Sequence, residues 1–260
     1  MNFQCQTEAM ANLKILAEHK QHGVLIVGPA GCGKTYLAKA YANLLKIPDF
    51  YIVNPVMGDL KVMLDSCVSS TNPQVLCIEN LDSGVLQASY PLLKLIEDCP
   101  SHIYIVVTCC NLYAIPDTIP SRCALVTVNQ PTAADIAQYA QSVDATNYDL
   151  VSKQKIWGCV KGFADADTVL KFTPEHLRYF DNLRTLLSFK DSISNIAWKL
   201  SHFEDKTDTP IILVFRYIML IIPTEYGKKT CVDCLNDLAA NNLSKNAVIS
   251  KFVLENKYCG

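Results

Sequence analysis

The segment Val24-Leu25-Ile26-Val27-Gly28-Pro29-Ala30-Gly31-Cys32-Gly33-Lys34-Thr35 decides how the first half of this chain folds. The four apolar residues Val24–Val27 have the length of a buried strand, and the helical stretch Thr35–Leu45 follows the glycines. Between them, Gly28–Thr35 fits the pattern G-x-x-x-x-G-K-[ST]. A glycine-rich loop between a strand and a helix lets backbone N–H groups surround phosphate oxygens, and the helix N-terminus adds positive potential. The segment therefore predicts a phosphate-binding loop.

The residues of this loop have separate predicted roles. Its first six residues are expected to contact the phosphates, mainly through the backbone: Gly28, Pro29, Ala30, Gly31, Cys32 and Gly33. Lys34 is expected to reach the β- and γ-phosphates, and the Thr35 hydroxyl to bind Mg²⁺. In the empty loop the Lys34 ammonium is expected to be solvated, so that its removal costs little stability. The sequence therefore predicts ATP and Mg²⁺ as cofactors.

A second part of the site is expected at the end of another buried strand. Val75–Ile78 is apolar, and Glu79 follows it where an acid would hold Mg²⁺ through water. Asn80 stands where P-loop ATPases of this kind usually have a glutamate that polarises the attacking water. An amide cannot take a proton at neutral pH, so hydrolysis is expected to be slow. Asp82 is the nearest other acid, and the alternative for Glu79 is that it merely ends a strand.

Five short apolar runs indicate an α/β fold. Each has the length of a strand and is followed by a loop or a helical segment: Val24–Val27, Phe50–Val53, Val75–Ile78, Ile103–Val107 and Ala124–Val128. This alternation is typical of a parallel sheet covered by helices on both faces. We therefore predict a five-stranded parallel sheet with Val24–Val27 and Val75–Ile78 central, preceded by an amphipathic helix over residues 8–20.

The pattern becomes helical after Pro131. Thr132 and Asp135 form a capping sequence for a helix over Ala133–Gln141, and a second helix is expected over about Leu150–Phe163. Thr173-Pro174-Glu175 begins another helix. The predicted domains are a nucleotide-binding α/β domain at 1–130, a helical lid domain at 131–192 and a helical, collar-like oligomerisation domain at 193–260.

Composition narrows the class of protein. The chain has 260 residues, a formal net charge of −2 and a pI of about 6.2. A protein that binds nucleic acid as a monomer is usually basic, so the charge argues against such a protein but leaves DNA binding by an assembly open. The start of the chain has no secretory leader. The longest apolar run, Ile211–Ile222, contains Arg216 and is too short to span a membrane, so it is interpreted as a buried helix or an oligomer contact. A cytoplasmic location without membrane attachment is expected.

The 12 cysteines do not form a recognisable framework. They are scattered over a long chain, which favours free thiols in a reducing cytoplasm over disulfides. Cys231 and Cys234 form a C-x-x-C pair without a second pair, whereas structural zinc takes four ligands. The pair is interpreted as two thiols one helical turn apart.

Two further motifs carry a family resemblance. The run Ile103–Asn111 ends in Thr-Cys-Cys-Asn, and Arg122 follows Asn111 by eleven residues inside Ser121-Arg122-Cys123. This order resembles the AAA+ ATPases of DNA clamp loaders. The resemblance implies that Asn111 is the polar sensor beside the γ-phosphate. It also implies that Arg122 is an arginine finger that points into the nucleotide of the neighbouring subunit.

The resemblance extends over about residues 8–190. Asn182-Leu183-Arg184 is similar to the lid-helix Leu-Arg of that family, which implies that Arg184 contacts the γ-phosphate from the lid. Asn129-Gln130-Pro131, at the entry to the helical part, is also similar. The chain departs from the family in its short leader, in the absence of a zinc-binding cysteine cluster and in its short last segment. A compact viral version, which would then be located in the host cytoplasm, or an otherwise divergent version would fit these departures.

The resemblance implies an ATPase subunit of a clamp loader. Such a subunit would join other AAA+ subunits in a ring or pentamer-like oligomer and use ATP to load a sliding clamp onto primer–template DNA. Two alternatives stay open. One is a nucleotide-dependent scaffold that assembles with little turnover, which Asn80 favours. The other is a helicase loader or similar remodeller, against which the Ser121-Arg122-Cys123 triplet argues.

Overall fold

A computed structural model describes most of the chain. The described residues are 4–54, 69, 71–83, 89–152, 156–188, 210–221, 225–239 and 247–252. The chain divides into two compact units, Met1–Ile136 with Gly162–Ala164, and Ala137–Lys161 with Asp165–Gly260. Each unit is described by itself. The predicted border between a lid domain and a collar-like domain falls within residues 189–209, which lie outside the described residues, so this division stays a prediction.

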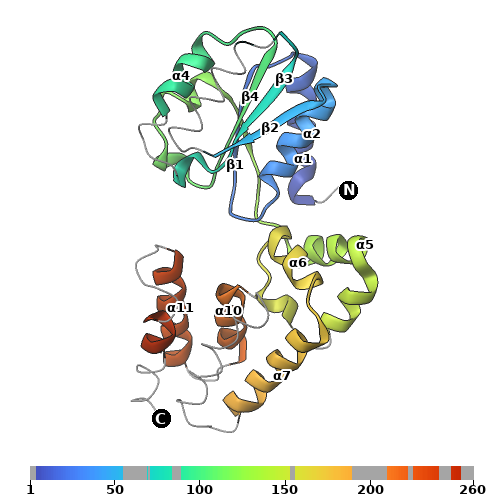
Figure 1. Cartoon of the computed structure of the whole chain (residues 1–260), viewed down its shortest axis with the longest axis vertical. Coiled ribbons are helices and arrows are strands. Elements are labelled where there is room, and N and C mark those ends of the chain that lie inside the picture. Colours follow the sequence, from blue (N-terminus) through green and yellow to red (C-terminus); the bar gives the residue numbers. More distant parts are fainter. Residues whose placement is uncertain are drawn as a thin grey trace. The chain divides into compact units, whose positions relative to one another are not determined.

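The first unit contains a parallel sheet of five strands in the order β2-β3-β4-β1-β5 (Figure 1). The strands are β1 (Gly23–Val27), β2 (Asp49–Val53), β3 (Gln74–Ile78), β4 (Ile103–Cys109) and β5 (Ala124–Thr127). All four neighbouring pairs are parallel. The predicted five-stranded parallel sheet is therefore confirmed. The predicted central strands β1 and β3 are both interior, and β4 lies between them in the middle.

Helices cover both faces of the sheet, as the continuous apolar runs predicted. Alternate residues of one strand face opposite sides, so Val24 and Ile26 pack on α1 (Gln4–Glu18) and α2 (Lys34–Leu45). Leu25, between them, packs in a second cluster with residues of α4 (Ser89–Glu97). β3 and β4 are buried along their whole length because they have neighbouring strands at both edges and helices on both faces.

The strand register brings distant segments to the same edge of the sheet. Val27 lies beside Cys109, and Ile78 lies beside Val107. The carboxyl ends of β1, β3 and β4 therefore meet, and the loops that follow them share one edge. At the opposite edge, β5 begins beside Val24. The candidate site lies at the edge formed by the carboxyl ends of β1, β3 and β4.

Helices follow the sheet, and the first of them begins in the first unit and continues into the second. α5 (Ala133–Ser152) begins with the predicted cap, in which the Thr132 N–H donates to Asp135 Oδ2 at 2.9 Å and the Asp135 N–H donates to Thr132 Oγ1 at 3.1 Å. Asp144 is non-helical, with φ −153° and ψ 92°, and its Oδ1 accepts from the Asn147 N–H at 3.0 Å. Asp144 therefore ends one helical segment and caps the next.

The single helix predicted over Leu150–Phe163 is wrong. α5 continues to Ser152, a 3₁₀ turn covers Ile156–Cys159, and α6 (Phe163–Leu170) begins where the predicted helix was expected to end. Gly158 and Gly162 both fall in this stretch, and glycine is a poor helix former. Gly162 also makes a close backbone contact with Gly31 that a continuous helix would not allow.

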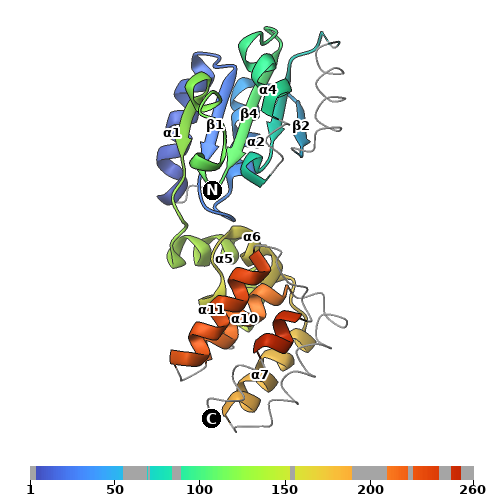
Figure 2. The same cartoon turned by 90° about the vertical axis from the view of Figure 1, so that its left-hand side faces the viewer.

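The remaining helices bury the apolar run of the sequence. α7 (Pro174–Ser188) starts at the predicted proline, and α10 (Ile211–Ile221) packs beside α11 (Glu225–Ala239), as Figure 2 shows. Within α10, Arg216 pairs with Asp165 at 2.7 Å, which satisfies the one charge in the run. No helix in the described parts of the chain has the length and apolar character needed to cross a membrane.

The Cys231–Cys234 pair lies on α11 with both thiols buried. Burial raises the pKa of Cys231 to about 12. Over the residues that the structure describes, no three or more histidine, cysteine, aspartate or glutamate side chains gather as metal ligands. The two thiols lie on one helix, three positions apart, as expected from the sequence.

Candidate nucleotide-binding site

The glycine-rich loop follows the carboxyl end of β1, as predicted. The Gly28 N–H donates to Cys109 O at 3.2 Å, and a side chain at Gly28 would lie 2.6 Å from the carbonyl oxygen of Val128. Gly31 and Gly33 have φ of 78° and 94°, a region that favours glycine. Ala30 is exposed at the loop, and Gly33 precedes the first residue of α2. The loop therefore presents its backbone ahead of a helix N-terminus.

Lys34 is buried in the structure, whereas a solvated ammonium was expected from the sequence. Only 7% of the surface of Lys34 is exposed. Nζ donates to Gly28 O at 2.8 Å, to Pro29 O at 3.0 Å and to Cys110 Sγ at 3.2 Å. Lys34 therefore joins the loop to the residue that follows β4.

Thr35 and Glu79 face each other across the site. The Thr35 hydroxyl donates a hydrogen bond to Glu79 Oε1, and the Glu79 N–H is held by Val53 O at 3.0 Å. A hydroxyl and a carboxylate are the oxygen ligands that Mg²⁺ prefers, with water completing its shell. The residues present thus fit a Mg²⁺ ion beside the phosphates. This is the pair to which the sequence assigned Mg²⁺.

Asn80 has a left-handed backbone with φ 48°. Its N–H donates to the buried Thr108 Oγ1 at 3.0 Å, and its carbonyl accepts from the Ser83 N–H at 2.9 Å. Asparagine adopts this conformation more readily than other non-glycine residues. The residue type is therefore explained by the turn that follows β3, and the expectation that Asn80 replaces a general base stays a prediction.

Asp82 connects the ends of β3 and β4. Its Oδ2 accepts hydrogen bonds from the Cys110 N–H at 3.0 Å and the Asn111 N–H at 2.9 Å. Its Oδ1 is buried without a hydrogen-bond partner. The Asp82 carboxylate therefore fixes the backbone that carries Asn111, a role that the sequence did not indicate.

Asn111 lies at the same edge of the sheet as the glycine-rich loop. Its side-chain oxygen accepts from the Tyr113 N–H at 3.0 Å and caps a short 3₁₀ turn, Leu112–Ala114. This leaves the amide NH₂ as the group that can donate to a phosphate oxygen. The neighbouring Cys110, which touches Lys34, shows that the end of β4 reaches the loop.

Arg122 lies at the opposite edge of the sheet. It ends a 3₁₀ turn, Pro120–Arg122, just before β5, and β5 starts beside Val24. The loop begins at the far end of β1, a strand of 5 residues, so about 16 Å of strand separates the two edges. The structure thus does not bring Arg122 to the nucleotide site of its own chain.

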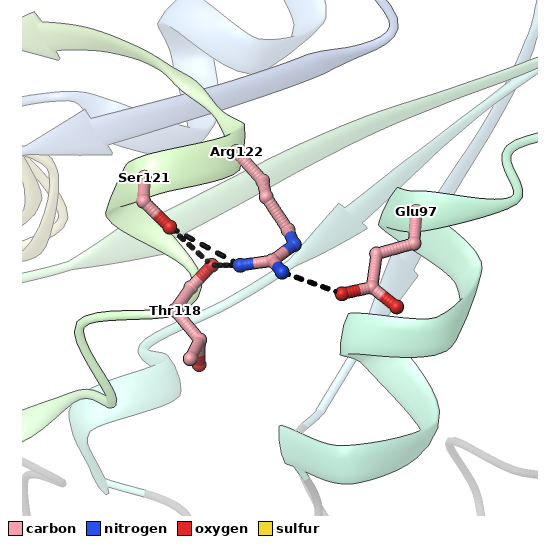
Figure 3. Close-up of polar contacts among 4 residues, drawn as sticks. All are labelled: Glu97, Thr118, Ser121 and Arg122. Carbon is pink, nitrogen blue, oxygen red and sulfur yellow. Dashed lines mark hydrogen bonds and ion pairs between the residues drawn. The ribbon is translucent and has the colours of Figure 1, made fainter.

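The Arg122 side chain is held by polar contacts with Ser121, Thr118 and Glu97 (Figure 3). Arg122 Nη1 donates to Thr118 O at 3.0 Å and to Ser121 Oγ at 3.2 Å, and Nη2 pairs with Glu97 Oε1 at 2.7 Å. Cys123 packs against the core of the sheet, and burial raises the pKa of its thiol to about 11. Sequence reasoning missed Glu97, because no local pattern connects it to Arg122.

Arg184 lies in the second unit, exposed on α7, while the preceding Leu183 is buried. Arg184 is near Tyr217 of α10, whose pKa is raised by burial and lowered in part by the arginine charge. Its assignment to the γ-phosphate stays a prediction.

Two supports of the loop come from segments far away in the sequence. Gln6 of α1 is buried, and its side-chain NH₂ donates to Cys32 O at 3.1 Å. The Phe163 N–H donates to Gly31 O at 2.9 Å, and a side chain at Gly162 would lie 2.7 Å from that same oxygen. Only the fold brings these residues to the loop, and no sequence signal identified them.

A parallel sheet of this order, with a glycine-rich loop and lysine at the end of β1 and an acid at the end of β3, defines a P-loop nucleotide-binding domain. The sequence agrees with this class. Residues 24–129 match the family described as ATPase family associated with various cellular activities (AAA), so this part of the chain is similar to AAA domains.

Known proteins resemble the chain at low identity. The sliding-clamp-loader large subunit of Escherichia phage RB69 is 26% identical over 129 residues, which is 46% of this chain and 40% of that protein. The chain thus matches less than half of that relative. A DNA polymerase III gamma subunit-related protein of Thermotoga maritima has a TM-score of 0.60 at 15% identity, covering 95% of this chain and 97% of the other. RuvB of the same organism, a Holliday junction branch migration motor, has a TM-score of 0.50 at 15% identity, covering 95% and 80%.

The contact between Gly162 and the loop gives a first prediction. Gly162→Ala should weaken ATP binding by at least about tenfold, since its Cβ would meet Gly31 backbone atoms at 2.7–2.9 Å and push the loop out of place. Calorimetric titration with ATP measures the affinity. Gly158→Ala is the matched control, because its Cβ would meet only the flexible end of Leu220. Unchanged affinity in Gly162→Ala would show that the loop does not depend on this contact.

The turn after β3 gives a second prediction. Asn80→Glu should raise the ATPase rate, because general-base assistance is typically worth about 10²–10⁴-fold. It should also lower the free energy of unfolding by about 1–2 kcal/mol, because glutamate is less suited to a left-handed backbone. Steady-state turnover and chemical denaturation measure the two effects. Asp82→Asn tests the alternative base: if it abolishes turnover while the fold stays intact and Asn80→Glu changes nothing, Asp82 supplies the base.

Proposed function

We propose that this chain is the ATP-binding subunit of a clamp-loader-like assembly. It binds ATP with Mg²⁺, hydrolyses it slowly and acts with other AAA+ subunits to load a sliding clamp onto primer–template DNA. The observation that carries the proposal is the position of Arg122 at the sheet edge opposite to the glycine-rich loop of its own chain. Because Arg122 lies away from the glycine-rich loop of its own chain, we assign it to the nucleotide of a neighbouring subunit.

ATP binding rests on the edge formed by β1, β3 and β4. When phosphates enter the loop, the Lys34 ammonium can exchange its carbonyl partners for β- and γ-phosphate oxygens. Thr35 and Glu79 would supply oxygen ligands for Mg²⁺, which would neutralise part of the phosphate charge. Asn111, held by Asp82, presents its amide at the same edge.

Slow hydrolysis follows from the residue at position 80. The attacking water needs a group that orients it and shares its proton, and the Asn80 amide offers only orientation. Glu79 is engaged with Thr35, and Asp82 with the backbone of Cys110 and Asn111. Fast turnover would therefore require a base from elsewhere in an assembly.

The clamp-loading role is supported by the triplet Ser121-Arg122-Cys123 together with the two relatives whose names refer to clamp loading and DNA polymerase III. The partners proposed are other AAA+ subunits in a ring or pentamer-like oligomer, a sliding clamp and primer–template DNA. Since the formal net charge is −2, the DNA contact is assigned to the assembly and not to one subunit.

A nucleotide-dependent scaffold with little turnover is the second candidate, and Asn80 favours it. The two functions differ in their response to substrate. Turnover that rises when primed DNA and a clamp are added indicates a loader. ATP-dependent assembly without stimulated turnover indicates a scaffold. A helicase-loader-like remodeller would assemble without retaining a clamp in a pull-down.

Lys34→Ala should abolish ATP binding, because the phosphates lose their neutralising ammonium. It should also lower the free energy of unfolding by about 1–3 kcal/mol, since Gly28 O and Pro29 O lose their charged donor. Calorimetry measures binding, and denaturation measures stability. Lys39→Ala, an exposed lysine on the same helix, is the control. ATP affinity equal to that of the parent would refute the site.

Arg122→Ala should leave ATP binding to the isolated subunit intact and reduce turnover in the assembly. In known systems an arginine finger supplied in trans raises kcat by a factor on the order of 10³–10⁵. The loss of kcat is smaller where the chemical step is already slow. Mixing this variant with Lys34→Ala subunits should restore turnover only at interfaces that combine an intact Lys34 with an intact Arg122. Arg178→Ala, an exposed arginine, is the control. A monomer that fails to bind ATP would mean that Arg122 acts within its own chain.

A further inference from the structure

Glu97 is the side chain that meets the outer part of the Arg122 guanidinium. It is the last residue of α4, and its Oε1 lies 2.7 Å from Arg122 Nη2 (Figure 3). Both side chains are partly exposed, 49% for Glu97 and 38% for Arg122. An ion pair as exposed as this contributes little to the stability of a fold. A stabilising role for the subunit therefore does not account for it.

The position of Glu97 on α4 is unfavourable by itself. The carboxyl end of a helix carries partial negative charge, so an acid there is repelled. Asp98 follows directly, and both residues are exposed. The cation that Glu97 contacts comes from a segment 25 positions further along the chain, at residue 122. The pairing with Arg122 therefore sets the orientation of both side chains.

The guanidinium is held from two sides. Thr118 O and Ser121 Oγ accept from Nη1, and Glu97 accepts from Nη2. Ser121 is itself fixed, because its hydroxyl donates to Thr118 O at 3.0 Å. A guanidinium has five N–H donors in one plane, so three acceptors define its plane while leaving other donors for a phosphate. A long, flexible side chain is thus held in one orientation.

We propose that Glu97 is a positioning residue for Arg122: it fixes the guanidinium in the isolated subunit so that the arginine meets a neighbouring subunit's γ-phosphate already oriented. This inference rests on the proposed function, in which Arg122 acts in trans. Charge stabilisation in phosphoryl transfer depends on geometry that exists before the reaction. Glu97 acts only through Arg122 and does not contact the nucleotide itself.

The test compares Glu97→Ala, Glu97→Gln and Asp98→Asn in the full chain, within the assembly that it forms with ATP. Glu97→Ala should lower kcat between about 10-fold and 100-fold with KM for ATP unchanged, because a misplaced catalytic group costs rate and not ground-state binding. Glu97→Gln should recover much of the rate, since its amide oxygen still accepts from Nη2. Asp98→Asn, which removes a neighbouring charge, should match the parent. The unfolding midpoint should stay unchanged in all three.

A double-mutant cycle separates positioning from a general effect on the interface. In an Arg122→Ala background, Glu97→Ala should cause no further loss, because the residue through which it acts is absent. Equal losses in both backgrounds would overturn the proposal. A turnover rate of Glu97→Ala equal to that of the parent would also overturn the proposal. A rate above that of the parent would overturn it as well, because it would mean that the ion pair keeps Arg122 away from the nucleotide.

Failure of the proposed function gives a different result. If the chain does not assemble with ATP, or if Arg122→Ala leaves turnover in the assembly unchanged, the trans role of Arg122 is wrong and the inference falls with it. If Arg122→Ala lowers turnover and Glu97→Ala does not, only the role of Glu97 is wrong.

Discussion

The parallel register of the sheet is the constraint on which the rest of this structure depends. Because β1, β3 and β4 run in the same direction, the three loops that follow them meet at one edge. Lys34 shows how closely they meet: its ammonium contacts carbonyls of the first loop and a thiol at the end of β4. None of these loops is near another in the sequence, and an antiparallel pairing would separate them.

The same register places Arg122, to which the proposed function assigns a role in trans, away from the glycine-rich loop of its own chain. A loop that precedes a parallel strand lies at the edge opposite to a loop that follows one. Arg122 precedes β5, and Glu97 ends the helix that leads back to β4, so both lie away from the glycine-rich loop. A single chain thus has an edge that can receive phosphates and another that can offer an oriented cation. Side-by-side association of such chains would join the two.

Sequence reasoning succeeded where one short segment determines the outcome. The strands are continuous apolar runs, and the glycine-rich loop has a fixed spacing, so both could be located without the fold. It failed where a contact joins distant segments. The pairing of Arg122 with Glu97, the approach of Gly162 to Gly31 and the bonds from Asp82 to the end of β4 depend on tertiary structure. The solvation expected for Lys34 was wrong for the same reason.

Position 80 shows how backbone geometry and chemistry can compete for one residue. The turn after β3 needs a left-handed residue whose N–H reaches Thr108 and whose carbonyl accepts from Ser83. Asparagine satisfies this turn at low cost, whereas a glutamate would be strained there or would have to move the turn. Moving the turn would in turn shift Asp82, on which the backbone of Asn111 depends. The segment from Glu79 to Ser83 therefore holds the backbone that carries Asn111, and under the proposed function the amide at position 80 favours nucleotide-dependent positioning over rapid hydrolysis.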